Sequence, residues 1–187
     1  MHKTLIIVIF LQALYQLCAC GTVNTHLQAD SALIGKLRVG MPPIDSTTAI
    51  YELPVQDGVS YQDVVDSLKS LSEGKNFVNP ANFPIGEHMK KRGQPPVGVL
   101  EVRAFCNLGL GAEIMQDHPE FVVFAPCRIA IYEKPAANNK LKLYLALDRP
   151  TYDLKSIKHP SERAKKAAQQ LETTLLEIMD RASKGDL

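Results

Sequence analysis

Four cysteines are the residues of this chain best suited to covalent or redox chemistry. Cys18 and Cys20 lie near the N-terminus, whereas Cys106 and Cys127 lie in the middle of the chain. The sequence contains no Cys-x-x-Cys, no His-x-x-x-His and no cysteine–histidine haem-attachment motif, so we expect no metal and no cofactor. A nucleophilic thiol needs a depressed pKa, a neighbouring base and access to solvent. Arg128 adjoins Cys127, but alternation along a strand directs the two side chains to opposite faces, and we assign no catalytic residue.

The N-terminal cysteines belong to a segment typical of a secretory signal. A short basic start precedes an apolar run that is too short for a membrane span, which needs about 20 apolar residues. The segment resembles the lipobox of bacterial lipoproteins, with Leu17, Ala19 and Cys20 at positions −3, −1 and +1, and with Cys18 at −2 as a departure. This resemblance implies that Cys20 is lipidated after residues 1–19 are removed as a signal peptide. The alternative is a plain signal peptide cleaved near Ala19.

The rest of the chain divides into a tether and a body. Residues 20–46 are polar, include Pro42-Pro43 and show no sustained hydrophobic period, which predicts a lipidated tether. Residues 47–185 are predicted to form one α+β domain. Gly21, rather than an Asp retention signal, follows Cys20, so we expect a bacterial envelope protein anchored to the outer membrane and facing the periplasm.

Three segments between residues 97 and 148 alternate apolar and polar residues, as half-buried strands do. The segment 141–148 is the clearest, because every odd position is Leu and Lys142 and Asp148 lie on the other face. In the first two segments, the predicted core-facing residues are Leu100, Val102, Ala104, Cys106, Cys127, Ile129 and Ile131.

Charged and aromatic side chains are predicted to gather on the outward face of the same strands. Such a face is commonly a solvated surface with cross-strand ion pairs. Because Tyr and Arg are enriched in binding surfaces, it is also a candidate subunit interface or shallow ligand platform. The candidate binding residues are Arg103, Phe105, Arg128, Tyr132, Tyr144 and Asp148.

Cys106 and Cys127 are the two cysteines predicted to remain in the folded domain. Both are predicted to share the phase of buried residues, in a compartment where disulfides persist. We therefore predict a disulfide between them. The alternative is a pair of buried free cysteines that act as small apolar side chains.

The remaining segments complete a two-layer arrangement. A strand is expected over 49–55 and a helix after Ser60, where Asp63 completes a capping box. Residues 76–96 contain four prolines and are expected to be irregular, with at most a short helix over 85–91. A long helix with one apolar stripe follows Pro160. The predicted fold is α+β, with a four-stranded, mainly antiparallel sheet, two main helices on one face in the order β-α-β-β-β-α, and a short extra helix after strand 2.

Charge and glycine spacing argue against two classes of function. Lys and Arg number 21 against 20 Asp and Glu, so the chain lacks the basic excess of a nucleic-acid binder. Gly109 and Gly111 follow a strand, but Ile114 stands where a dinucleotide loop has its third glycine. We expect neither nucleic acid nor nucleotide as a ligand.

The core strands and their junctions resemble a known bacterial family. FCN at 105–107, PCRIAIYE at 126–133 and KLKLYLALDRP at 140–150 are similar to domain of unknown function 302, and the resemblance covers roughly residues 47–184. It implies a TATA-binding-protein-like α+β fold, often dimeric, with no established catalytic residues.

These observations favour an envelope-anchored, non-enzymatic binding or assembly domain. Its expected partners are the membrane, through the lipid anchor, and either a second copy or another envelope protein. The alternative is a thiol-dependent redox or sulfur-carrier protein that uses Cys106 and Cys127.

Overall fold

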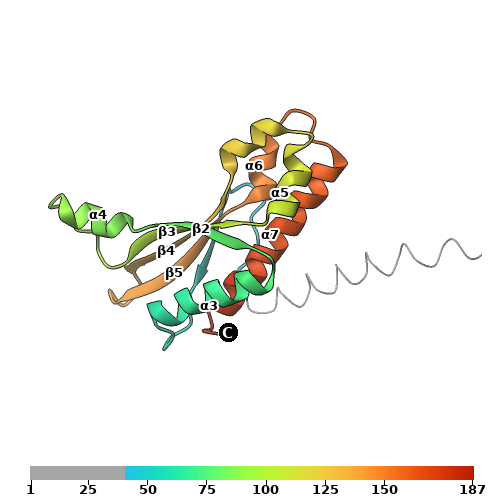
Figure 1. The fold of residues 1–187 in the computed structure, drawn as a ribbon. Coiled ribbons are helices and arrows are strands. Elements are labelled where there is room, and N and C mark those ends of the chain that lie inside the picture. Colours follow the sequence, from blue (N-terminus) through green and yellow to red (C-terminus); the bar gives the residue numbers. More distant parts are fainter. Residues whose placement is uncertain (1–40) are drawn as a thin grey trace, which may run out of the picture. The chain divides into compact units, whose positions relative to one another are not determined.

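Five antiparallel strands form one sheet in the order β1-β5-β4-β3-β2 (Figure 1). The computed structural model describes residues 41–187, which form one folded unit. The strands are β1 (Ile50–Pro54), β2 (Val78–Phe83), β3 (Leu100–Cys106), β4 (Cys127–Pro135) and β5 (Leu141–Asp148). Because β1 and β2 are the edge strands, the three strands with the clearest alternation lie at the centre of the sheet.

Two long helices cover one face of this sheet (Figure 1). They bury the centre of β4 and β5, where Ile129, Ile131 and Leu145 are fully buried. The helical elements are α3 (Tyr61–Gly74), α4 (Ile85–Lys91), α5 (Leu108–Met115), η1 (Pro119–Phe124), α6 (Pro150–Asp153), η2 (Leu154–Ser156) and α7 (Glu162–Ala182). Within residues 41–187, no helix has the length and apolar character needed to cross a bilayer.

The predicted α+β class is confirmed, but the predicted count of four strands is wrong. The fifth strand, β2, lies in the proline-rich segment that was expected to be irregular. It pairs with β3 around an irregularity between Val78 and Ala81, next to Pro80. Asn79 donates a side-chain hydrogen bond to the carbonyl of Ala104 at 2.5 Å within this irregularity. Proline is tolerated on an edge strand at a bulge, so Pro80 does not exclude a strand.

The two main helices begin and pack as their sequences predict. Ser60 caps α3, and its side chain and that of Asp63 each accept the other's backbone amide, which forms the predicted capping box. Ser161 caps α7 in the turn after Pro160. The predicted apolar stripe of α7 is buried: Ala164, Ala167, Ala168, Leu171, Leu175, Ile178, Met179 and Ala182.

Strand β3 faces the opposite way from its prediction. Phe105 pairs with Cys127 and Glu101 with Ile131, and directly paired residues of antiparallel strands point to the same face. Glu101 and Phe105 therefore face the helices and are buried, and Arg103 on the same face is partly buried. The apolar residues Leu100, Val102 and Ala104 lie on the other face of the sheet. Alternation alone predicts the wrong face because β3 has the apolar residue Phe105 in the same phase as Glu101 and Arg103. These two charged residues are accommodated beneath α3 because they pair with each other and Glu101 also accepts a hydrogen bond from Tyr61.

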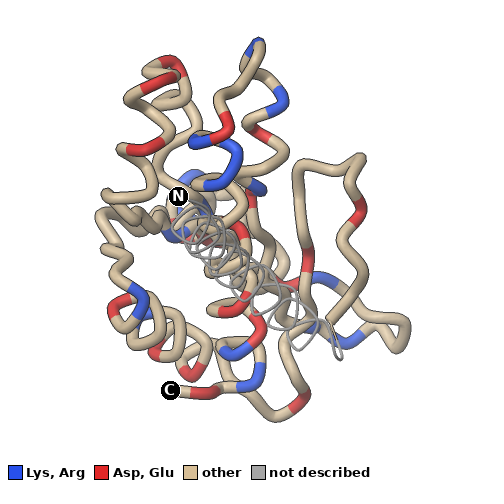
Figure 2. Tube along the Cα trace, turned by 90° about the vertical axis from the view of Figure 1, so that its right-hand side faces the viewer, with Lys and Arg blue, Asp and Glu red and all other residues tan. Residues whose placement is uncertain are grey.

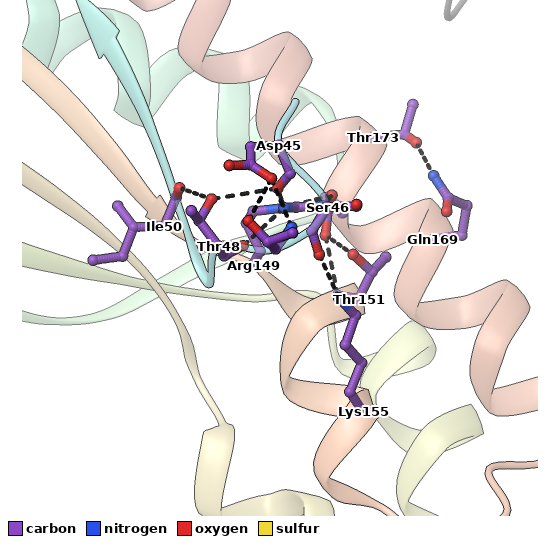
Figure 3. Close-up of polar contacts among 11 residues, drawn as sticks. Asp45, Ser46, Thr48, Ile50, Arg149, Thr151, Lys155, Gln169 and Thr173 are labelled. Atoms are coloured by element: carbon purple, nitrogen blue, oxygen red, sulfur yellow. Dashed lines mark hydrogen bonds and ion pairs between the residues drawn. The ribbon is translucent and has the colours of Figure 1, made fainter. Parts of the chain in front are cut away.

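A buried ion pair attaches the start of the folded unit to its C-terminal helices. The guanidinium of Arg149, at the end of β5, lies 3.0 Å from the carboxylate of Glu172 on α7, and both residues are buried. Arg149 also donates to the carbonyls of Asp45 (2.6 Å) and Thr48 (2.9 Å), as Figure 3 shows. Asp45 and Thr48 are thus held against the end of β5.

Candidate functional site

Two adjoining cavities lie beside the first residue of α3, next to residues of β3, β4 and β5. One encloses about 570 Å³ between the β1–α3 loop and the β4–β5 turn, and the other about 380 Å³ beside α4. Both cavities are lined by Tyr61, the first residue of α3, and by Glu133 on β4. We call this combined space the cleft. Volumes of this size accommodate small molecules.

A hydrogen-bonded network centred on the buried carboxylate of Glu101 lies at the inner wall of the cleft, which Tyr61 and Glu101 line. Glu101 accepts one hydrogen bond from the Tyr61 hydroxyl at 2.8 Å and another from Nε of Arg103 at 2.7 Å. Burial, and then the hydrogen bond to Glu101, raise the pKa of Tyr61, so this phenol remains a donor. The bonds to Glu101 and Tyr61 raise the pKa of Arg103 although burial opposes the shift. Burying such charges costs free energy unless they are well paired, and this pair is.

Glycine at one position allows a second carboxylate to close the wall of the cleft. Gly98 has a φ of +78°, and a Cβ there would lie 2.4 Å from Oε2 of Glu133. The same oxygen of Glu133 accepts the backbone amide of Val99 at 2.8 Å. Sequence analysis did not identify Tyr61 or Glu133, because no local pattern links them to Glu101.

The opposite face of the sheet contains only part of the predicted binding surface. Arg128, Tyr132, Tyr144 and Asp148 lie there, and we call this the uncovered face because α3 and α7 both lie on the other side (Figure 1). Arg103 and Phe105 do not belong to it. Arg103 pairs with Ile129 and so lies on the face covered by the helices, and Phe105 is a core residue with 1% exposure.

Polar groups on the uncovered face are paired with one another. Arg128 forms an ion pair with Asp148. The rings of Tyr132 and Tyr144 stack with centroids 6.0 Å apart. Glu52 on β1 accepts hydrogen bonds from the Tyr132 hydroxyl and from Lys134. These two bonds lower the pKa of the Glu52 carboxyl although burial opposes the shift. Figure 2 shows basic and acidic residues interspersed along the chain.

The two predicted core cysteines line one small cavity but are not bonded to each other. Both are free cysteines, so the predicted disulfide is absent from the structure. The cavity encloses about 30 Å³ at the ends of β3 and β4, beneath α5 and η1. Because Phe105, not Cys106, pairs with Cys127, alternation directs the two cysteine side chains to opposite faces of the sheet. The shared phase on which the disulfide prediction rested is therefore wrong.

Burial makes both thiols poor nucleophiles. It raises the pKa of Cys106 and, with repulsion from Cys106 and from two nearby aspartates, raises that of Cys127 to about 12. Asp153 lines the same cavity, and burial together with Asp148 raises its pKa to about 6. Among residues 41–187, no three His, Cys, Asp or Glu side chains are grouped to hold a metal ion.

Cys20 lies outside the described residues, as do the predicted signal peptide and most of the tether.

Comparison with known proteins identifies relatives of this chain. A protein from Aquifex aeolicus (strain VF5), described as uncharacterized, is 37% identical over 78 residues, which cover 42% of this chain and 48% of that protein. The matched stretch thus spans about half the length of this curated relative.

A solved structure shares the fold. The crystal structure of an uncharacterized conserved DUF302 protein from Bacillus stearothermophilus matches with a TM-score of 0.62 at 18% identity, covering 72% of this chain and 98% of that one. The model of the family "Domain of unknown function DUF302" matches residues 51–182. The chain therefore belongs to the DUF302 family.

Proposed function

We propose that this protein is an envelope-anchored lipoprotein whose folded domain binds a small polar ligand in the cleft and catalyses no reaction. The observation that carries the binding role is the buried carboxylate of Glu101 at the wall of the cleft, held by hydrogen bonds from Tyr61, which also lines the cleft, and from Arg103. Glu101 is only 8% exposed, and glutamate is rarely this buried in a protein interior. A buried carboxylate beside a cavity, with partners such as Tyr61 whose pKa is shifted, is typical of binding sites.

The cleft offers a ligand both signs of charge and several hydrogen-bonding groups. Glu101 and Glu133 lie on its inner wall. Around it lie Lys140 and two exposed ion pairs, Lys142 with Asp57 and Lys90 with Glu87. A ligand that carries both an acidic and a basic group can pair with both sets. This mixed lining favours a zwitterionic or uncharged polar molecule over a highly charged one.

The first experiment asks what co-purifies with the native protein. The lipoprotein is extracted from its own membranes in mild detergent and examined by native mass spectrometry, together with Glu101→Gln and, as a matched control on the uncovered face, Glu52→Gln. We expect a small-molecule adduct on the wild type and on Glu52→Gln that Glu101→Gln lacks. Urea unfolding of each variant establishes that it is folded.

Three results would contradict ligand binding in the cleft. One is an adduct that survives Glu101→Gln, and another is a wild type that carries no adduct. The third is a co-purifying protein that is lost only with Glu52→Gln, which would place binding on the uncovered face. The anchor is tested separately: Cys20→Ser should release the protein from membranes or leave its precursor uncleaved.

The redox or sulfur-carrier alternative rests on the cavity that Cys106 and Cys127 share. Thiol exchange needs a thiolate, and a pKa of about 12 leaves Cys127 almost entirely protonated at neutral pH. Burial therefore weighs against this alternative. Its test is thiol titration of the folded protein before and after mild reductant, where an easily reduced pair with a low thiolate pKa would restore it.

A further inference from the structure

Glu133 is the acidic residue of the cleft that has no cationic partner within residues 41–187. It is half-buried and lines both cavities, so its charge lies where the two cavities meet. The other acidic residues that line the cleft each form an ion pair: Glu101 with Arg103, Glu87 with Lys90, and Asp57 with Lys142. A half-buried carboxylate without a counter-charge attracts a cationic group more strongly than a fully solvated one does.

The backbone holds the carboxylate of Glu133 in place and leaves one of its oxygens free. Oε2 accepts the amide of Val99 at 2.8 Å, whereas Oε1 receives no hydrogen bond from the described residues. Gly98 makes this approach possible, because a Cβ at that position would overlap with Oε2 of Glu133. The carboxylate is thus positioned before any ligand arrives, and less conformational freedom is lost on binding.

The wall of the smaller cavity, beside α4, presents hydrogen-bond acceptors. Tyr61 and Glu101 line this cavity together with Glu133. The Tyr61 hydroxyl donates its hydrogen to Glu101, so its own oxygen can still accept a bond. The lysine of this cavity, Lys90, is paired with Glu87 at the exposed surface. Such a wall is complementary to a ligand group that carries positive charge and donates hydrogen bonds.

We propose that the ligand of the cleft carries an ammonium group, which binds Oε1 of Glu133 in the smaller cavity. This inference rests on the proposed binding function and names the chemistry of the ligand's basic group. A compact ammonium suits one free carboxylate oxygen, whereas a guanidinium pairs best with two oxygens side by side. A metal ion fits less well, because no three His, Cys, Asp or Glu side chains within residues 41–187 are grouped to hold one.

Two small probes of similar size test the requirement for positive charge. Ethanolamine has an ammonium group where ethylene glycol has a second hydroxyl. Each is titrated into the isotopically labelled full-length protein in mild detergent, and binding is followed by NMR at the amide of Val99, which contacts Glu133. We expect ethanolamine to bind at least about tenfold more tightly, because hydrogen bonds between charged groups are stronger than those between neutral ones.

Substitutions in the smaller cavity test the role of Glu133. Glu133→Gln should abolish the preference for ethanolamine, although it keeps a side-chain oxygen for the amide of Val99. The matched control is Glu87→Gln, which removes an exposed charge from the same cavity and should change the affinity for ethanolamine by less than about twofold. Gly98→Ala keeps the charge of Glu133 but displaces its carboxylate, so it should also weaken ethanolamine binding. Urea unfolding establishes that each variant is folded.

The outcomes separate this inference from the binding function of the cleft. Equal affinity of the wild type for the two probes would overturn the ammonium proposal, and so would a Glu133→Gln variant that keeps the preference. Equal losses in Glu87→Gln and Glu133→Gln would also overturn it, because the general field of the cleft would then be responsible. A native adduct that depends on Glu101 but contains no amino group would leave the cleft as a binding site and contradict this inference alone. A wild type with neither adduct nor probe binding would overturn both.

Discussion

Replacing Glu172 by alanine should destabilise the domain more than any exposed substitution. The change removes the partner of Arg149, which is 6% exposed and cannot reach water without disrupting the packing around it. It also removes the acceptor of the Thr151 amide, which is bonded at 3.0 Å. Removing one partner of a buried ion pair costs about 3–5 kcal/mol.

Urea unfolding followed by circular dichroism measures this cost. With a slope of about 2 kcal/mol/M, typical of small domains, a loss of about 4 kcal/mol lowers the unfolding midpoint by about 2 M. The matched control is Glu87→Ala, which breaks the exposed pair with Lys90 on α4 and should leave the midpoint nearly unchanged. The double variant Arg149→Met with Glu172→Leu should recover much of the loss, because apolar residues of similar volume remove the unpaired charge.

The reasoning fails if Glu172→Ala lowers the midpoint no more than Glu87→Ala does. It also fails if the double variant is less stable than Glu172→Ala alone, because the unpaired guanidinium would then not be the source of the cost.

Three further predictions follow from burial. Phe105→Ala should cost about 3–5 kcal/mol in urea unfolding because Phe105 lies in the core, whereas Phe83→Ala, at a position that is 50% exposed, should cost far less; equal costs would contradict the observed phase of β3. Cys127 should react with a thiol reagent at neutral pH much more slowly than it does in urea, and a folded protein that reacts at the unfolded rate would contradict the raised pKa. Asp153→Asn should stabilise the domain above pH 6 and have little effect near pH 4. The folded-state pKa of Asp153, about 6, lies above the ordinary 3.8, so the folded domain loses stability as the pH rises from about 4 to 6 and Asp153 ionises. A variant whose effect on stability is the same at both pH values would refute the shift.

The sequence predicts this fold well where a local pattern carries the information. The capping box of α3 and the stripe of α7 depend on residues within a few turns of each other, and both are as predicted. The Leu repeat of β5 likewise leaves one phase for the core, and Leu145 and Leu147 are fully buried.

The sequence fails where partners are distant along the chain. Glu101 and Arg103 have the residue types of a solvated face. Their mutual ion pair is local, but the hydrogen bond from Tyr61, forty residues before Glu101, comes from a distant element that the sequence pattern does not reveal. The cleft was not predicted because it is built from this same long-range contact. The misassigned phase of β3 then led to the predicted disulfide, because Cys106 was placed on the face of Cys127.

The attachment of residues 42–48 has a mechanical consequence. Tyr51 donates to the carbonyl of Pro42 at 2.9 Å, and the side chains of Arg149 and Lys155 bind three further carbonyls of this segment. A force transmitted along the chain toward Met41 would load these bonds before it reached the ladder between β1 and β5. Because Arg149 is itself held by Glu172, the load would pass into α7, the longest helix of the domain, rather than into an edge strand that can peel away one residue at a time.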